Sequence, residues 1–339
     1  MERVLAALQG KESDRRAFTM TLSLYGAKLT DCPLLEYYTR PERYLEGQIE
    51  VARQCRTDII FTPFVLPFEA QAFGSDILYL EKYPPNVRKP FIRDLVDIDK
   101  IKVPDLKNDA GLNYLRESSR LLAAHFKGTV PVCGILTSPM DLPAIIMGVD
   151  NWLEILLFDK AKARAVTAVM SAYFVAMANS LFDAGVDFLG MAMVFSNPKI
   201  LFEKTVVDVI VPALADIFAQ LKGPVVFHHG SLPIAGYLPL YRNLPNVAGF
   251  LLDQRDDLSK ARQIAGENVL LLGNLEGPTL AKVGTARALE KAQRILENRK
   301  DDRHFILATS SADVAWDTPL ETITGIYDLV RRYEASHAG

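Results

Sequence analysis

The sequence predicts an α/β fold, a (β/α)8 TIM barrel, and three observations support that prediction. Eight short runs rich in Val, Ile, Leu and Phe recur along the chain, and such runs are typical of parallel strands buried on both faces. Longer amphipathic patterns separate them, and strands that alternate with helices indicate a parallel sheet. No break in composition divides the chain, so eight strands favour a closed barrel, with an open doubly wound sheet as the alternative.

The expected strands and helices alternate in a regular order. We expect strands at Ala17–Leu22, Asp58–Phe64, Val130–Leu136, Phe188–Met193, Pro224–His228, Ala248–Leu252, Val269–Gly273 and Phe305–Thr309. The clearest helical patterns are Arg43–Gln54, Gly111–Phe126, Lys160–Ala184, Pro198–Leu221, Thr285–Asn298 and Thr318–Ala335. Pro198 and Pro319 stand near helix starts, where the missing N–H costs little. Gly185 and Gly223 follow expected helix ends, where glycine is favoured.

Residues 65–110 interrupt this alternation. The segment is acidic and rich in proline, and it includes Tyr83-Pro84-Pro85. It predicts an insertion after the second strand, with short strands of its own. Loops at the carboxyl ends of barrel strands cover the catalytic face. We therefore expect residues 1–339 to form a single barrel domain with an inserted loop region at about 65–110.

Composition and charge narrow the classes of partner. Hydrophobic residues make up 49% of the chain, charged residues 23%, and the net charge is -3, which gives no reason to expect nucleic acid or an anionic membrane as a partner. Cys32, Cys55 and Cys133 are too few and too scattered for a disulfide framework and fit a reducing compartment. No uncharged apolar run approaches the ~18–20 residues of a membrane span, and no secretory signal is evident. We expect a cytoplasmic protein.

Four short motifs, in the same order along the chain, resemble those of the uroporphyrinogen decarboxylase superfamily. They are RVLAALQGKESDR at 3–15, GVD at 185–187, GNLEGP at 273–278 and DTPLE at 317–321. Each motif alone is weak, but together they span nearly the whole chain. The resemblance implies the same barrel fold and two possible chemistries, those of the decarboxylases and of the methylcobamide:coenzyme M methyltransferases.

The decarboxylase motifs are not kept. Members of that branch carry an arginine-rich segment after the first strand, where this chain reads TMTLSLYG at 19–26. They also carry an aspartate after the second strand, where this chain has Pro63. Their substrate bears eight carboxylates and develops positive charge on a pyrrole, so its site needs arginines and an acid. The sequence therefore disfavours decarboxylation, which stays as the alternative.

The methyltransferase branch is locally more similar. The segment PFVLPFEAQAFG at 63–74, with Glu69, resembles its members. Those enzymes hold zinc with a His-x-Cys pair and a later Cys, and the metal makes a thiolate available at neutral pH. If His228 is the histidine, Gly230 and Ala312 stand where the two cysteines would be. The Cys-rich zinc site is therefore missing, and a site made from His228, His229 and a carboxylate such as Glu69 or Asp253 stays open.

His228 and Glu69 are the expected catalytic residues. His228-His229 ends an apolar strand, where barrel enzymes place their chemistry, and histidine suits acid–base work or metal ligation near pH 7. Glu69 lies among phenylalanines, so desolvation would raise the pKa of its carboxyl. A histidine satisfied by backbone groups and a carboxylate at a helix N-terminus are the structural alternatives. Further expected substrate-binding residues are His229, Asp253, Asn274, Glu276, Asp141 and Tyr25.

These features favour one component of a corrinoid-dependent methyltransferase. It would move a methyl group between a small substrate or acceptor, for example a methoxylated compound as in an O-demethylase, and a corrinoid held by a separate partner protein. The alternatives are a decarboxylase like the uroporphyrinogen enzyme and a non-catalytic binding relative. The hypothesis requires Glu69, His228, Asp253 and Asn274 to meet around one cavity.

Overall fold

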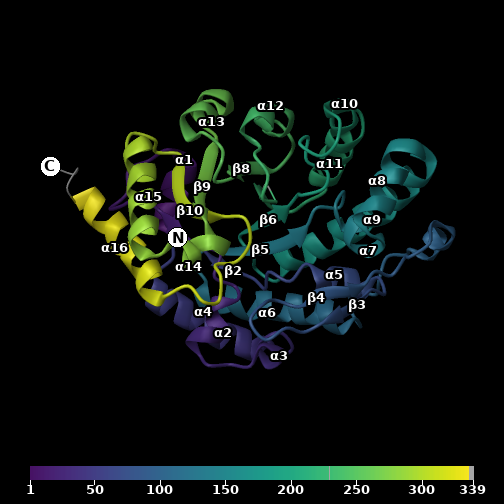
Figure 1. Cartoon of the computed structure of the whole chain (residues 1–339), viewed down its shortest axis with the longest axis horizontal. Coiled ribbons are helices and arrows are strands. Elements are labelled where there is room, and N and C mark those ends of the chain that lie inside the picture. The colour runs from purple at the N-terminus through teal and green to yellow at the C-terminus, as the bar shows by residue number, and fades with distance from the viewer. Residues whose placement is uncertain (229, 336–339) are drawn as a thin grey trace.

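Eight parallel strands form one sheet that curls into a barrel, as the sequence predicts (Figure 1). The computed structural model describes residues 1–228 and 230–335. The barrel strands are β1 Phe18–Thr19, β2 Ile60–Phe61, β5 Val132–Thr137, β6 Phe188–Ala192, β7 Val225–His228, β8 Val247–Leu251, β9 Leu270–Glu276 and β10 Phe305–Ser310. They pair in the order β1-β10-β9-β8-β7-β6-β5-β2, and each pair is parallel.

The two ends of this sheet, β1 and β2, meet and close the barrel. The backbone N–H of Asp58 donates to the carbonyl oxygen of Phe18 at 2.7 Å. The hydroxyl of Thr19 donates to the carbonyl of Ile59 at 3.3 Å. The sheet therefore has no long exposed edge, which removes the groups that would otherwise pair with other chains.

A buried ion pair stands at the start of both closing strands. Nη1 and Nη2 of Arg15 donate to the two carboxylate oxygens of Asp58 at 2.6 and 2.9 Å, and both side chains are buried. The same carboxylate accepts the N–H of Phe18 at 2.9 Å and Nη1 of Arg3 at 3.1 Å. The RVLAALQGKESDR motif thus supplies two of the cations that hold β2 against β1.

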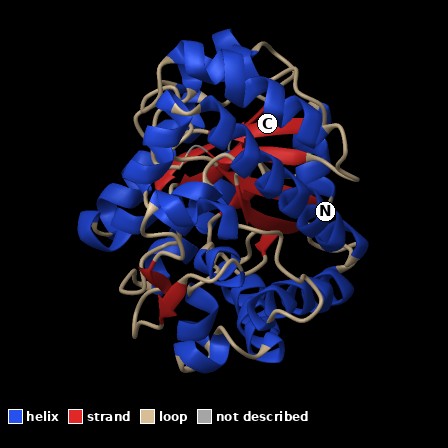
Figure 2. Cartoon of the chain, turned by 90° about the vertical axis from the view of Figure 1, so that its right-hand side faces the viewer, coloured by secondary structure: helices blue, strands red, loops and turns tan. Residues whose placement is uncertain are grey.

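Helices surround the strands on the outside, and β3 Asp76–Leu78 and β4 Asn86–Lys89 form a separate antiparallel pair (Figure 2). The helices are α1 Glu2–Gln9, α2 Tyr25–Leu29, α3 Leu34–Tyr37, α4 Pro41–Cys55, α5 Pro67–Ala72, η1 Leu95–Lys100, α6 Ala110–Phe126, α7 Leu142–Met147, α8 Val149–Phe158, α9 Lys160–Asp183, α10 Glu203–Thr205, η2 Val206–Ile210, α11 Val211–Phe218, η3 Ala235–Tyr237, α12 Leu238–Tyr241, α13 Leu258–Ala265, η4 Gly277–Thr279, α14 Leu280–Val283, α15 Thr285–Asn298 and α16 Leu320–Ala335.

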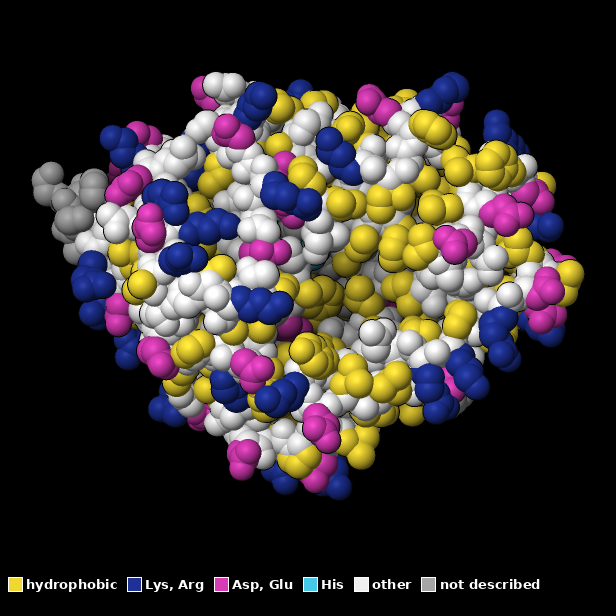
Figure 3. All heavy atoms as spheres, in the orientation of Figure 1, with side chains coloured by type: hydrophobic (Ala, Val, Ile, Leu, Met, Phe, Trp, Pro, Cys, Tyr) yellow, Lys and Arg dark blue, Asp and Glu magenta, His cyan; other side chains and the backbone are white. Residues whose placement is uncertain are grey.

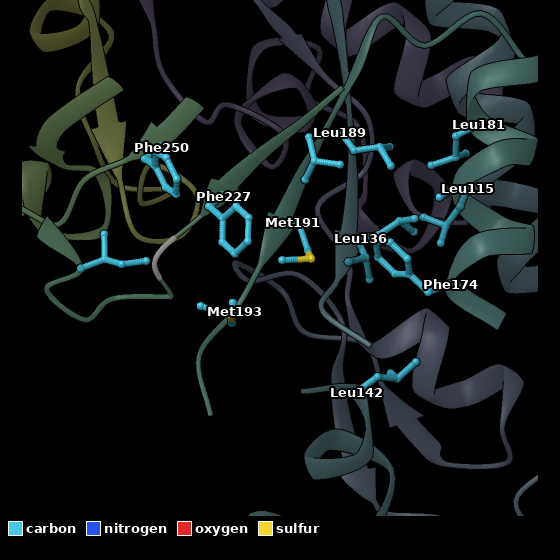
Figure 4. Packing of buried hydrophobic residues seen from close by; sticks show 14 of the residues in the cluster. Leu115, Leu136, Leu142, Phe174, Leu181, Leu189, Met191, Met193, Phe227 and Phe250 are labelled. Atoms are coloured by element: carbon cyan, nitrogen blue, oxygen red, sulfur yellow. The ribbon is translucent and has the colours of Figure 1, made fainter. Parts of the chain in front are cut away.

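Side chains alternate between the two faces of each strand, and this divides the apolar core into a part inside the barrel and a part between the sheet and the helices. Cys133 and Ile135 of β5 belong to the cluster inside the barrel. Leu136, on the opposite face of the same strand, packs in the layer between sheet and helices with Phe174 of α9 (Figure 4). Phe227 of β7 lies in that outer layer too, with its ring centroid 5.5 Å from that of Phe250 on β8. Successive strand side chains point to opposite faces, so each strand except β1 contributes to both parts, and in β1 the inward residue is Thr19.

The first two strands are shorter than predicted, and side-chain hydroxyls take part in the hydrogen bonds just beyond them. Beyond β1, the N–H of Thr21 donates to Oγ1 of Thr309 at 2.8 Å. Beyond β2, Oγ1 of Thr62 accepts the N–H of Ile135 at 3.0 Å. The chain stays beside its neighbour in both places, but without the regular backbone pairing that defines a strand.

The single helix predicted at Pro198–Leu221 is wrong in detail. The structure has α10, then the π-helical turn η2, then α11. Pro212 lies in the first turn of α11 and has no N–H to continue the ladder. The wider π-helical turn before Pro212 accommodates this missing hydrogen bond. The apolar periodicity of the sequence does not predict such a turn.

Helix α9 is long and apolar enough to cross a membrane by length and composition. In the structure it packs against α6, α8, α11 and β5. Its buried face includes Met170, Phe174 and Met177. Packing on the barrel accounts for this buried face, and 39% of the most apolar window of the helix is buried.

Removing the carboxylate at the closure should cost stability. We expect Asp58→Ala to lower the free energy of unfolding by about 3–5 kcal/mol, because Arg15 is left buried without its partner. Urea unfolding followed by circular dichroism measures this loss. Asp14→Ala is the control: Asp14 also pairs with Arg3, but its side chain is 64% exposed, so the expected loss is below about 1 kcal/mol. Equal losses in the two variants would contradict the role given to the buried pair.

Candidate functional site

A small cavity lies inside the barrel, and residues on or beside all eight strands line it. Its volume is about 40 Å³, room for only a few water-sized groups. Its lining is Thr19, Thr21, Ile59, Phe61, Phe64, Cys133, Ile135, Phe188, Gly190, Val226, His228, Leu251, Leu272, Ala308 and Thr309. The face drawn in Figure 3 is hollowed near its middle, and hydrophobic side chains border the hollow.

His228 ends β7 and turns its imidazole into this cavity. Its Nε2 hydrogen-bonds the carbonyl oxygen of Ser311, in the loop after β10. Its Nδ1 accepts the N–H of Gly230 at 3.2 Å. A carbonyl can only accept and an N–H can only donate, so these two partners place the ring proton on Nε2. The edge of the imidazole stands against the ring of Phe64, with centroids 5.8 Å apart.

Burial keeps His228 uncharged. Desolvation lowers the pKa of its imidazole to about 4, while the hydrogen bond to the Ser311 carbonyl opposes that change. The ring is therefore neutral at pH 7 and acts as a hydrogen-bond donor through Nε2.

Gly230, which fixes the other ring nitrogen, has φ +62°, and a Cβ there would lie 2.7 Å from the carbonyl oxygen of Met193. Only glycine fits this backbone position. The orientation of the His228 ring thus depends on a residue that stands where related methyltransferases have a zinc-binding cysteine.

Three threonines supply the other hydroxyl groups of the cavity. Thr19 and Thr21 come from the first strand segment and Thr309 from β10. They are not among the site residues predicted from the sequence. Their spacing in the sequence could have indicated this role. Thr19 and Thr21 are two residues apart in the segment where the decarboxylases are expected to carry arginines, and residues at this spacing in a strand share a face.

Glu69 does not line this cavity. It lies on α5 and is buried, and its Oε2 accepts the N–H and the hydroxyl of Thr137 at 2.8 and 2.6 Å. Burial raises the pKa of its carboxyl to about 7, and the bonds from Thr137 oppose the rise. The structure therefore separates Glu69 from the cavity that His228 enters, and ties it to the end of β5.

Asp253 and Asn274 meet each other at the ends of β8 and β9. Nδ2 of Asn274 donates to the carbonyl oxygens of Asp253 and Asp256 at 2.9 and 3.1 Å. The Asp253 carboxylate accepts Nε of Arg255 at 2.6 Å. Neither Asp253 nor Asn274 lines the cavity in the barrel, so the four-residue convergence expected from the sequence does not occur at this cavity.

The other expected site residues hold loops together. Oδ1 of Asp141 accepts the N–H of Ser196 at 2.8 Å, in the loop after β6. The hydroxyl of Tyr25 donates to the carbonyl of Thr318 at 2.8 Å. Glu276 accepts the hydroxyl of Thr279 at 2.9 Å and lines a different pocket. His229 lies outside the described residues.

Across residues 1–228 and 230–335, no three His, Cys, Asp or Glu side chains gather as they would around a metal ion. Both ring nitrogens of His228 have protein partners. The two positions that would carry thiolates hold Gly230 and Ala312. The described residues therefore do not fit the Cys-rich zinc site.

Comparison with known proteins places the chain in a family. The model of the family described as uroporphyrinogen decarboxylase (URO-D) matches residues 1–333. The chain belongs to the uroporphyrinogen decarboxylase family. Relatives of both chemistries are found: methylcobamide:CoM methyltransferase MtbA of Methanosarcina mazei is 24% identical over 242 residues, 70% of each chain. Uroporphyrinogen decarboxylase of Geobacter sulfurreducens is 23% identical over 313 residues, 87% of this chain and 88% of the relative.

The barrel also resembles a solved member of this fold. A methyltransferase from Methanosarcina mazei superposes with a TM-score of 0.85 at 17% identity, covering 99% of this chain and 98% of the other. At this identity the likeness shows the fold and not the activity. Within the uroporphyrinogen decarboxylase family, the choice between chemistries therefore depends on the residues that line the site.

The low pKa of His228 predicts a pH-dependent stability. The folded-state pKa of about 4 lies below the usual 6.5, so the unfolded chain binds more protons between these values. Stability from the neutral ring is full above pH 6.5 and is lost as pH falls toward 4. From pH 7 to pH 5 the protein should lose about 2 kcal/mol more than the His228→Gln variant. Urea unfolding at both pH values measures this difference.

His125→Gln is the matched control for that measurement. His125 lies on the exposed face of α6, so its replacement should leave the pH dependence as it is in the unmodified protein. If His228→Gln keeps that same dependence, the ring is not held neutral by burial.

Proposed function

We propose that this chain is the methyl-transferring component of a corrinoid-dependent system, moving a methyl group between a small substrate or acceptor and a corrinoid held by a separate protein. Relatives named as methylcobamide:CoM methyltransferases support this class. The observation that carries the proposal is the cavity itself, which is small and almost entirely apolar and has no ionised side chain among the described residues that line it.

The lining of the cavity disfavours the decarboxylase reaction. No Arg, Lys, Asp or Glu is among its lining residues in the described part of the chain. A substrate with eight carboxylates needs cationic partners. Burial of an unpaired carboxylate in apolar surroundings is strongly unfavourable because the charge loses its solvation. The threonines and aliphatic side chains found here instead suit a neutral group of about the size of a methyl.

His228 and Cys133 are the titratable groups of the lining. Burial lowers the pKa of His228 and raises the pKa of the Cys133 thiol, so both are neutral at pH 7. In the proposed reaction, Nε2–H of His228 leaves the Ser311 carbonyl and hydrogen-bonds the heteroatom that gains or loses the methyl group. The bond orients that atom and stabilises charge that develops on it.

The corrinoid would supply the cobalt that exchanges the methyl group, and the partner protein would present it over the barrel mouth. This chain would hold the small substrate, exclude water with Phe61 and Phe64, and fix the reacting atom beside His228. Glu69 acts through Thr137 in this proposal, as a positioning residue at the end of β5. An ether carries no charge and therefore fits a neutral pocket. The alkoxide left after O-demethylation of a methoxylated compound would accept a hydrogen bond from Nε2–H of His228 and would take its proton from solvent as it leaves.

Methyl transfer tests the proposal directly. The purified protein is incubated with methylcob(III)alamin and a panel of thiols, and with reduced cobalamin and a panel of methyl ethers, while the corrinoid spectrum is followed. We expect transfer with at least one acceptor or donor. His228→Ala should slow it by about 100-fold, the size of effect typical for a lost hydrogen-bond donor at a reacting atom.

His125→Ala, an exposed histidine on α6, is the control and should leave the rate unchanged. Release of carbon dioxide from uroporphyrinogen without any methyl transfer would overturn the proposal in favour of decarboxylation. Saturable binding of a substrate without turnover in either assay would instead indicate a non-catalytic relative.

A further inference from the structure

A second pocket lies outside the barrel, beside the carboxyl end of β9. Its volume is about 340 Å³, much larger than that of the cavity in the barrel. Its lining is Gln254, Leu275, Glu276, Thr279, Leu280, Val283, Arg287, Ala288, Glu290, Lys291 and Arg294. It shares no lining residue with the cavity that contains His228, so it is a separate site.

Helix α15 turns three cations toward this pocket. Arg287, Lys291 and Arg294 are four and three residues apart, a spacing that puts them on one face of a helix. Arg294 lies 3.5 Å from the carboxylate of Glu290. Across residues 1–228 and 230–335, Arg287 and Lys291 have no carboxylate within 4.0 Å, and the ammonium of Lys291 instead donates to Oε1 of Gln254 at 3.2 Å.

The three cations of the lining, Arg287, Lys291 and Arg294, outnumber its two carboxylates, so the charge of the pocket favours an added oxyanion. Lys291 is only partly exposed. Burial lowers the pKa of its ammonium group, and the carboxylates of Glu276 and Asp253 oppose that change. The pocket also contains two carboxylates: that of Glu290, beside Arg294, and that of Glu276, which accepts the hydroxyl of Thr279 at 2.9 Å. An oxyanion between Lys291 and Arg287 would form charge-assisted hydrogen bonds with both and offset the lost solvation.

We propose that this pocket binds a small molecule through an oxyanion group, with Lys291 and Arg287 as its main ligands. Barrels of this class often bind phosphate groups near the loops after their seventh and eighth strands, and β9 is the seventh barrel strand in chain order. The shared chemistry is a compact tetrahedral or planar oxyanion: a phosphate, a sulfonate or a carboxylate. The proposal does not depend on methyl transfer, since the pocket and the barrel cavity are distinct.

Isothermal titration calorimetry at low ionic strength tests it, with inorganic phosphate, methanesulfonate and acetate as separate probes. We expect saturable binding of at least one probe to a single site, and the probe that binds identifies the oxyanion class. Lys291→Met keeps the length of the side chain and removes its charge, and it should weaken binding at least 10-fold, the loss expected for one charge-assisted bond.

Lys282→Met is the matched control. Lys282 is an exposed lysine on α14 that does not line the pocket, so its replacement changes the net charge equally and should leave binding within about twofold. Arg287→Gln, at an exposed position, is the second test variant in case Lys291→Met does not fold, and it should also weaken binding. Absence of saturable binding for all three probes, or equal losses in the pocket and control variants, would overturn the proposal.

Discussion

Closure of the barrel by the buried Arg15–Asp58 pair is the constraint on which the rest of the structure depends. The pair holds the start of β2 against the start of β1, and the two strands complete a ring that β10 to β5 leave open. Only a closed ring has an interior that eight strands line together. The cavity with His228 therefore depends on an ion pair at the opposite, amino-terminal end of the strands, where barrel residues serve stability and not chemistry.

The interior of this ring determines which chemistry the family fold can support here. A buried histidine with one ring nitrogen on a glycine N–H and the other on a carbonyl stays neutral. The motif resemblance places threonines where decarboxylases of the family are expected to have arginines, and Gly230 and Ala312 where the methyltransferases are expected to have cysteines. The same barrel thus surrounds an uncharged cavity, which suits transfer of a neutral group more than removal of a carboxylate.

Polar residues at strand ends divide into two kinds in this molecule. His228 enters the cavity, whereas Glu69, Asp141 and Asn274 bind backbone groups of neighbouring loops. Loops at a barrel mouth have many backbone N–H and C=O groups without ladder partners, and buried groups of this kind need side-chain partners. The loops at the barrel mouth therefore need polar side chains to hold them in place, and these side chains are of the same types as those that serve in catalysis.

The sequence by itself determined the eight strands, most of the helices, the family motifs and the absence of the cysteine ligands, because periodicity and local spacing carry that information. It also placed His228 at a strand end. Only the tertiary structure decided that His228 faces the cavity while Glu69 faces the helix layer, and that Thr19, Thr21 and Thr309 share that cavity. The reason is physical: the direction of a strand-end side chain and its loss of solvent depend on how distant strands pair and pack, which no local pattern encodes.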